Sequence, residues 1–231
     1  GWGLAWYPDR SAALVKEALD WRASGYSKFL ESYARLQSAI YIAHVRHRST
    51  GGPPTYADTH PFDRELDGRH FCFAHNGTIR DYAELPLGRH QPLGGTDSER
   101  LFCHLLALME SRQSDLKAPD DWAWLHDSLQ RLNERGTINC LLSDGRRLFC
   151  YHDQTAWKGL SYRQLRFNQG DEHRLEDSTL GLEIDSDVYN SGYVIATCPL
   201  SESGWTSFVP GQLLVLEQGS VVLSTHAPPP C

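Results

Sequence analysis

Two hydrophobic patterns alternate along the chain: a period of two, typical of strands, and a recurrence every three or four residues, typical of helices. The helical pattern covers 97–112 and 121–134, and Thr96 opens the first of these segments as an S/T-x-x-E capping box. The segment 11–36 has similar spacing, so we expect one or two helices there, interrupted near Gly25.

Strands are predicted on both sides of these helices. Their β-branched and aromatic residues mark the segments 1–7, 38–45, 70–75, 138–143, 146–152, 192–198, 212–217 and 220–224. Asp144-Gly145 has the sequence of a type I′ hairpin turn. A loop is expected over 47–62, and 155–190 matches no regular element. Strands, then helices, then strands indicate a layered α+β fold rather than a parallel βαβ sheet.

The composition is that of a soluble globular protein. The 231 residues can bury a sizeable core, and no Pro/Gly/Ser linker divides them, so we expect one domain over 1–231. A net charge of −7 gives no basic field for phosphates, and no apolar run approaches the roughly 18 residues of a membrane span. We therefore expect a small-molecule target, with no nucleic acid and no membrane as partner.

The six cysteines have neither a CxxC pair nor a regular spacing; they are at positions 72, 103, 140, 150, 198 and 231. This pattern argues against a zinc framework and against a disulfide scaffold. A reducing, cytoplasmic location is the expectation that fits best.

Four polar clusters stand at predicted strand ends, in loops or at a helix start, where scaffolds usually present functional groups. They read AHVRHRSTGG at 43–52, THPF at 59–62, FAHNGT at 73–78 and GGTDSE at 94–99. Taken singly, Arg46 is best explained as a surface cation and Asn76-Gly77 as a tight turn. Thr96 with Glu99 is a helix cap, which leaves the neighbouring Asp97 without an explanation.

The histidines in these clusters suggest one competing class, a metal-dependent hydrolase that uses His44, His47 and His60. No HExxH pattern or carboxylate spacing accompanies them, so we expect no metal.

The four clusters in this order resemble the class II glutamine amidotransferases, N-terminal-nucleophile enzymes with a four-layer αββα fold. The resemblance is strongest to the small stand-alone subfamily that includes bacterial amidotransferase-like proteins and the γ-glutamyl amidase of ergothioneine synthesis. It extends from GWGLAWY at 1–7 through NCLLSDGR at 139–146 to IATCPL at 195–200. Each tetrapeptide alone is a weak signal, whereas four in order are a strong one.

The resemblance implies a role for each cluster. Asn76, through its side-chain amide, and Gly77, through its backbone N–H, would form the oxyanion hole for a tetrahedral intermediate. Arg46 would bind the α-carboxylate of glutamine and Asp97 its α-ammonium. The remaining implied residues are Ser49, Thr50 and His60 as pocket lining, and His75 as a residue that orients the Asn-Gly segment. The substrate would be glutamine or a γ-glutamyl compound, no cofactor would be needed, and an acceptor enzyme is a possible partner.

One element of the family pattern is missing from the sequence. The family's nucleophile is an N-terminal cysteine whose own α-amine is the general base, a few tens of residues before the GWG segment, whereas residue 1 here is Gly. None of the six cysteines has a free α-amine, so the chain alone is expected to be inactive. Truncation is the favoured explanation. The alternatives are a nucleophile on a separate chain and a non-catalytic glutamine-binding or regulatory module.

Overall fold

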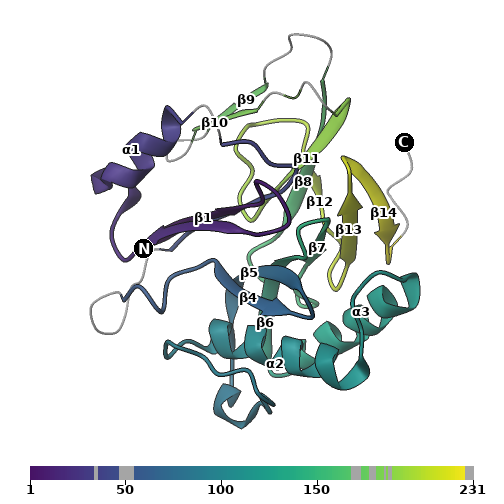
Figure 1. Ribbon diagram of the computed structural model, residues 1–231. Coiled ribbons are helices and arrows are strands. Elements are labelled where there is room, and N and C mark those ends of the chain that lie inside the picture. The colour runs from purple at the N-terminus through teal and green to yellow at the C-terminus, as the bar shows by residue number, and fades with distance from the viewer. Residues whose placement is uncertain are drawn as a thin grey trace.

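A six-stranded antiparallel sheet organises the fold (Figure 1). The computed structural model describes residues 1–33, 36–46, 55–167, 173–176, 181–184, 186 and 189–226. The large sheet has the order β14-β13-β7-β6-β5-β4. Its strands are β4 (Phe62–Leu66), β5 (Arg69–Ile79), β6 (Gly136–Ser143), β7 (Arg147–Tyr151), β13 (Leu213–Glu217) and β14 (Ser220–Ser224).

Two helices, α2 (Asp97–Arg112) and α3 (Pro119–Asn133), cover one face of this sheet. Their apolar stripes pack against side chains of β5, β6, β7 and β13 in the largest core cluster, which includes Phe73, Phe102 and Leu129. The rings of Phe73 and Phe102 stack with centroids 5.2 Å apart, which joins β5 to α2. Both helices were predicted, and their positions are confirmed.

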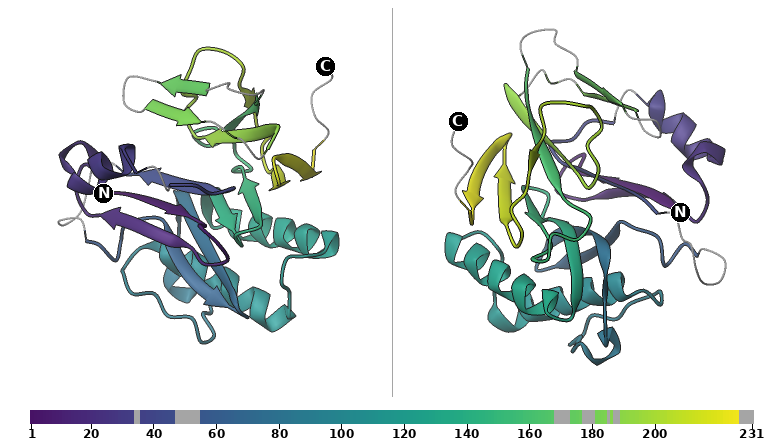
Figure 2. Two further views of the ribbon diagram at one scale, coloured as in Figure 1. Left: turned by 45° about the horizontal axis from the view of Figure 1, so that its top comes forward. Right: turned by 180° about the vertical axis from the view of Figure 1, so that it is seen from behind.

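Smaller sheets cover the other face, as Figures 1 and 2 show from different sides. The first has the order β2-β1-β3 and the second β11-β8-β12, and β9 pairs with β10 as a separate hairpin. Their strands are β1 (Trp2–Trp6), β2 (Ala13–Glu17), β3 (Tyr41–Val45), β8 (Ser161–Arg166), β9 (His173–Glu176), β10 (Gly181–Ile184), β11 (Ser191–Ala196) and β12 (Thr206–Ser207). Apolar clusters between the layers hold both three-stranded sheets to the large one.

The prediction of helices over 11–36 is wrong for the first part of that segment. Residues 13–17 form β2, antiparallel to β1, and the helix α1 is confined to Gly25–Glu31 after a 3-10 turn at Trp21–Ala23. The reason is tertiary: Leu14 packs in the cluster between the layers, where a strand of the small sheet can place it. Helix α1 lies near one end of β1 and buries none of its own residues.

Other local expectations need smaller corrections. The predicted loop ends at Phe62, where β4 begins, and the unassigned segment contains β8, β9 and β10. The β6–β7 hairpin has a positive φ at Gly145 of 82°, followed by Arg146 outside the left-handed region. That is the pattern of a type II′ turn rather than the type I′ turn expected from Asp144-Gly145. A second 3-10 turn, η2, covers Tyr82–Glu84.

The capping box is half confirmed. Thr96 caps α2, because its Oγ1 accepts from the Glu99 N–H at 3.2 Å. The Glu99 carboxylate, however, does not return to Thr96. It accepts from the Leu93 N–H at 3.0 Å and the Gly94 N–H at 2.7 Å and pairs with Arg64 at 2.6 Å. Glu99 therefore holds the loop before the helix.

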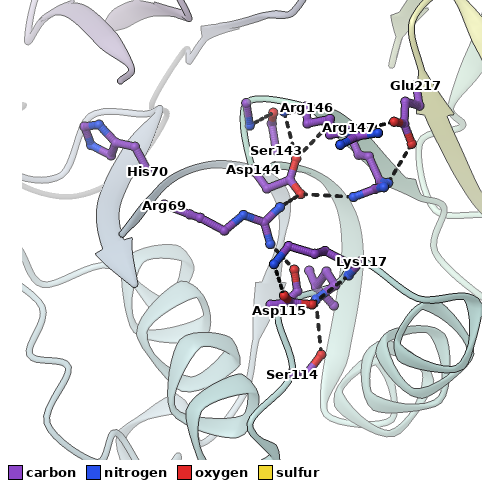
Figure 3. A network of polar contacts seen from close by, with 12 residues as sticks. Arg69, His70, Ser114, Asp115, Lys117, Ser143, Asp144, Arg146, Arg147 and Glu217 are labelled. Atoms are coloured by element: carbon purple, nitrogen blue, oxygen red, sulfur yellow. Dashed lines mark hydrogen bonds and ion pairs between the residues drawn. The ribbon is translucent and has the colours of Figure 1, made fainter. Parts of the chain in front are cut away.

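A network of charged side chains lies at the end of the large sheet where β5 and β7 begin and β13 ends (Figure 3). Asp144 has a fully buried side chain, and its Oδ1 accepts from the backbone N–H groups of Arg146 at 2.9 Å and Arg147 at 2.6 Å. The same carboxylate pairs with Arg69 of β5. Glu217 of β13 binds both Arg146 and Arg147, at 2.5 and 2.8 Å. These contacts tie β5, β7 and β13 together at one end.

In the part of the chain that the structure describes, every helix is too short or too polar to cross a membrane.

Candidate functional site

Arg46 lies at the end of β3, where the small sheet reaches the end of the large one. The β1–β3 ladder continues past β3, since the Arg46 N–H donates to the Gly1 carbonyl at 2.9 Å. The Arg46 side chain is half-buried, and its charge helps to lower the pKa values of His44, His60 and His75, after burial as the larger cause for each. The guanidinium thus adds positive charge to the surroundings of all three imidazoles.

Asn76 and Gly77 belong to β5 rather than to a turn, which corrects the simplest explanation of the Asn-Gly pair. Both pair in register with β6, Asn76 with Asn139 and Gly77 with Ile138. A Cβ at Gly77 would lie 2.8 Å from the carbonyl carbon of Thr137, well inside van der Waals contact. The position therefore requires glycine because of close strand packing.

Strand geometry indicates where the two groups point. Asn76 shares a face of β5 with Cys72 and Ala74, which pack against the small sheet, so it faces the space between the layers. Its carboxamide makes no hydrogen bond within the described residues. The Gly77 N–H points to the same edge of β5 as that of Ile79, away from β6, and β4 pairs with β5 only as far as Phe73.

Asp97, the first residue of α2, reaches this uncovered edge. Its Oδ2 accepts from the Ile79 N–H at 2.8 Å, and its Oδ1 accepts from the Ser98 N–H at 2.9 Å. Burial lowers the pKa of His75, while the charge of Asp97 raises it and that of Arg46 lowers it. Asp97 therefore binds the end of β5, and Arg46 and Asp97 contribute opposite charges to the surroundings of His75.

His75 is fully engaged on the helix side of β5. Its Nε2 lies 3.1 Å from the Thr137 carbonyl and must therefore donate, and its Nδ1 lies 2.9 Å from the Ser98 hydroxyl, which donates to it. With both ring nitrogens in use and a pKa lowered by burial, His75 fixes α2 to β5 and β6 in a neutral form.

His60 is buried close to this centre, 1% exposed, and stacks on His44 with ring centroids 4.2 Å apart. Burial lowers the pKa of His44 to about 4 and that of His60 well below its usual value. Neither ring nitrogen of His60 has a hydrogen-bond partner in the described part of the chain. His47, Ser49 and Thr50 lie outside the described residues, so their predicted roles stay predictions.

Across residues 1–33, 36–46 and the later described ranges, no three or more His, Cys, Asp or Glu side chains are grouped so that they could hold a metal ion.

Sequence reasoning missed one polar residue that belongs to the site by position. Asn139 lies directly opposite Asn76 on β6 and is 3% exposed. In the sequence Asn139 is the one amide in the apolar strand INCLLS at 138–143, which could have marked it. The sequence does not show which residue of a neighbouring strand lies opposite it.

The comparisons with known proteins add a family to this geometry. A family profile described as glutamine amidotransferases class-II matches residues 1–230. The chain belongs to this family. YafJ of Escherichia coli, itself a predicted glutamine amidotransferase, is 30% identical over 92% of this chain and 82% of YafJ. An uncharacterised protein of Methanocaldococcus jannaschii is 35% identical over 97% of this chain, which spans only 62% of that relative.

Solved structures of amidotransferases agree with this assignment. A predicted glutamine amidotransferase from Pseudomonas aeruginosa superposes with a TM-score of 0.77 and 29% identity, over 96% of this chain and 86% of that one. Glutamine phosphoribosylpyrophosphate amidotransferase from B. subtilis gives a TM-score of 0.60 at 17% identity, over 96% of this chain and 42% of that one. The latter likeness concerns the fold alone, and the predicted α+β class of this amidotransferase chain is confirmed.

The described cysteines of this amidotransferase chain are poor nucleophiles in their folded positions, apart from the exposed Cys198. Burial raises the pKa of the thiols of Cys72 and Cys140 to about 12 and also raises those of Cys103 and Cys150. A thiol with such a pKa supplies almost no thiolate at neutral pH. Cys72 is a core residue that packs between the layers.

Proposed function

We propose that residues 1–231 form one αββα amidotransferase domain that binds glutamine and hydrolyses its side-chain amide to glutamate and ammonia. The observation that supports the proposal is that the Asp97 carboxylate binds the end of β5 two residues after Gly77, while Arg46 follows the end of β3. The Asn76 carboxamide and the Gly77 N–H, on the same stretch of β5, supply two N–H donors.

In this proposal each group binds one part of the substrate. The α-carboxylate binds the Arg46 guanidinium, which can form two parallel hydrogen bonds, and the α-ammonium binds Asp97. The side-chain carbonyl then reaches the Asn76 carboxamide and the Gly77 N–H, which stabilise the oxyanion of the tetrahedral intermediate. The likeness to the amidotransferase family supports this assignment, and no cofactor takes part in it.

The attacking group in this proposal is an N-terminal cysteine thiolate outside residues 1–231. It adds to the amide carbon; the C–N bond then breaks and the nitrogen leaves as ammonia with a proton from the α-ammonium of the cysteine. Water hydrolyses the thioester to glutamate and regenerates the thiol. Without that cysteine the chain would bind but not turn over substrate.

The binding half of the proposal can be tested on residues 1–231 by calorimetric titration with glutamine. We expect Asp97→Asn to weaken binding about tenfold to a hundredfold, because a hydrogen bond to a charged group contributes about 1.5–3 kcal/mol. Thr96 still caps α2, but the amide leaves the Ile79 or the Ser98 N–H without an acceptor, so the thermal midpoint should fall by roughly 2–4 °C for each kcal/mol lost. Arg80→Gln, which alters an exposed arginine near the same strand end, is the matched control for Arg46→Gln. Equal affinity in Arg46→Gln and Arg80→Gln would contradict the assignment of Arg46.

The catalytic half is tested on the full reading frame by following glutamate release, beside the same protein with its N-terminal cysteine changed to alanine. Activity lost in the variant supports the amidotransferase. Glutamine binding without turnover in either protein would favour the second candidate, a non-catalytic glutamine-binding module, because the binding residues are present while the buried cysteines are unreactive. Turnover of larger γ-glutamyl amides but not of glutamine would place this protein with the γ-glutamyl amidases, and an acceptor enzyme for the ammonia would then be unnecessary.

A further inference from the structure

A row of buried polar side chains crosses the inner face of the large sheet beside Asn76. Asn139 of β6 lies directly opposite Asn76, and His152, which follows β7, contacts Asn139 from the other side. Asn139 is 3% and His152 2% exposed. Because a buried amide is costly unless its hydrogen bonds are made, this row needs a structural or a functional reason.

Two backbone groups fix the orientation of the Asn139 carboxamide. Its Oδ1 accepts from the Asp153 N–H at 3.1 Å, and its Nδ2 donates to the Trp157 carbonyl at 2.8 Å. A rotated carboxamide would set an N–H against the Asp153 N–H and an oxygen against the Trp157 oxygen. Only one orientation is therefore allowed.

His152 and Asp153 hold that orientation in place. The Asn139 oxygen can only accept, so His152 Nδ1, 2.7 Å away, must carry the proton, and burial lowers the pKa of His152, which keeps the ring neutral. The Asp153 carboxylate is buried and accepts from the Ile138 N–H at 2.8 Å and from Asn133 Nδ2 at 2.7 Å. The loop that presents the Asp153 N–H is thereby anchored to β6 and α3.

We propose that Asn139 is a positioning residue that sets the orientation of Asn76. With its oxygen turned to His152, the Asn139 nitrogen faces β5, and one of its two N–H groups is left after the bond to Trp157. Residues directly opposite on antiparallel strands have Cβ atoms about 4.5–5.5 Å apart. The Asn76 carboxamide makes no hydrogen bond to Asn139 in the structure, and rotation of its side chain would bring Oδ1 to that N–H. Asn76 must then present its own NH₂ group to the substrate, and never its oxygen, which would repel an oxyanion.

This inference rests on the proposed function, and its test separates the two. In the full-length enzyme we expect Asn76→Ala to lower kcat for glutamine about a hundredfold, as for other oxyanion donors. Asn139→Ala should lower kcat at least about tenfold with KM within about threefold, because a misplaced catalytic group costs rate rather than ground-state binding. Asn139→Asp replaces the N–H donor by an acceptor and therefore favours a rotated Asn76 carboxamide. This variant should lower kcat nearly as much as Asn76→Ala does.

The decisive measurement is the double variant Asn76→Ala/Asn139→Ala. If Asn139 acts through Asn76, the double variant is no slower than Asn76→Ala alone. If the fold-loss of kcat in the double variant equals the product of the two single losses, or if Asn139→Ala keeps the wild-type kcat, the positioning role is overturned. The proposed function would remain intact. An unchanged kcat in Asn76→Ala, or an inactive parent enzyme, would overturn both.

Gln212→Ala is the matched control for loss of a buried amide. The Gln212 side chain is 4% exposed and lies outside the network that orients Asn139: it donates to the Ser224 hydroxyl at 2.8 Å and accepts from the Val209 N–H at 2.9 Å. It should lower the thermal midpoint as Asn139→Ala does and keep kcat within about threefold. An equal loss of kcat in both variants would mean that Asn139 acts only through stability.

Discussion

Replacing Gly77 by alanine would test the close strand packing on which the proposed oxyanion hole depends. The added Cβ would lie 2.8 Å from the Thr137 carbonyl carbon, whereas such carbons normally keep about 3.5–4.0 Å. The carbonyl belongs to β6 and cannot rotate away as a side chain would, so the two strands must separate locally by about 1 Å. Overpacking of this kind costs about 1–3 kcal/mol.

The expected thermal effect follows from the size of the chain. For a domain of about 150–250 residues, 1 kcal/mol lowers the midpoint by roughly 2–4 °C, so Gly77→Ala should melt roughly 2–12 °C below the parent protein. A shift of about 1 Å in a catalytic group costs about a hundredfold in rate, so kcat for glutamate release should fall by that factor in the full-length enzyme.

Gly25→Ala supplies the control, because a Cβ at Gly25, the first residue of α1, meets nothing within 4 Å. The same chemical change there should leave stability unchanged or raise it by about 0.4–1 kcal/mol. Differential scanning calorimetry and a glutamate-release assay compare the three proteins. A Gly77→Ala protein with the parental midpoint and kcat would refute the reasoning, since the strands would then have room for a methyl group.

Further outcomes are expected elsewhere in the molecule. Asp144→Ala should lose about 1–3 kcal/mol, measured by urea denaturation, because Arg69 loses its carboxylate partner and the N–H groups of Arg146 and Arg147 lose their acceptor. His44 has a pKa of about 4 in the folded protein against 6.5 in the unfolded chain, so the unfolded state binds more protons between these pH values. Stability should therefore fall as the pH drops from 6.5 to 4. In His44→Gln the thermal midpoint should fall less over the same pH range. In a native thiol titration Cys198 should react quickly, while Cys72 and Cys140 should react only after unfolding.

Residues fixed by local chemistry could be predicted from the sequence. The helix 97–112 has a long apolar period and a threonine cap, and the structure places α2 over the same residues. Arg46, Asn76 and Asp97 were selected because their motifs follow one another in a family order, and the structure places Asn76 on β5 and binds Asp97 to the end of that strand. Their roles as ligands stay predictions.

Features that depend on distant neighbours could not be predicted. Residues 13–17 are compatible with either period over so short a stretch, and pairing with β1 makes them a strand. Glu99 can reach either the helix cap or the preceding loop, and only the position of Leu93 and Gly94 decides between them. Asn139 faces Asn76 because of a strand register that no local pattern specifies.

Arg46 and Asp97 stand on different layers of the molecule, one at the end of the small sheet and the other at the start of a helix beyond the large sheet. An amino acid whose α-carboxylate binds Arg46 and whose α-ammonium binds Asp97 would therefore tie together layers that are otherwise joined mainly by apolar contacts. At a hundred times its dissociation constant such a ligand adds about 2.7 kcal/mol to folding. That gain should be concentrated in slower amide hydrogen exchange of β1 and β3, so that occupancy of the site governs how often the small sheet opens.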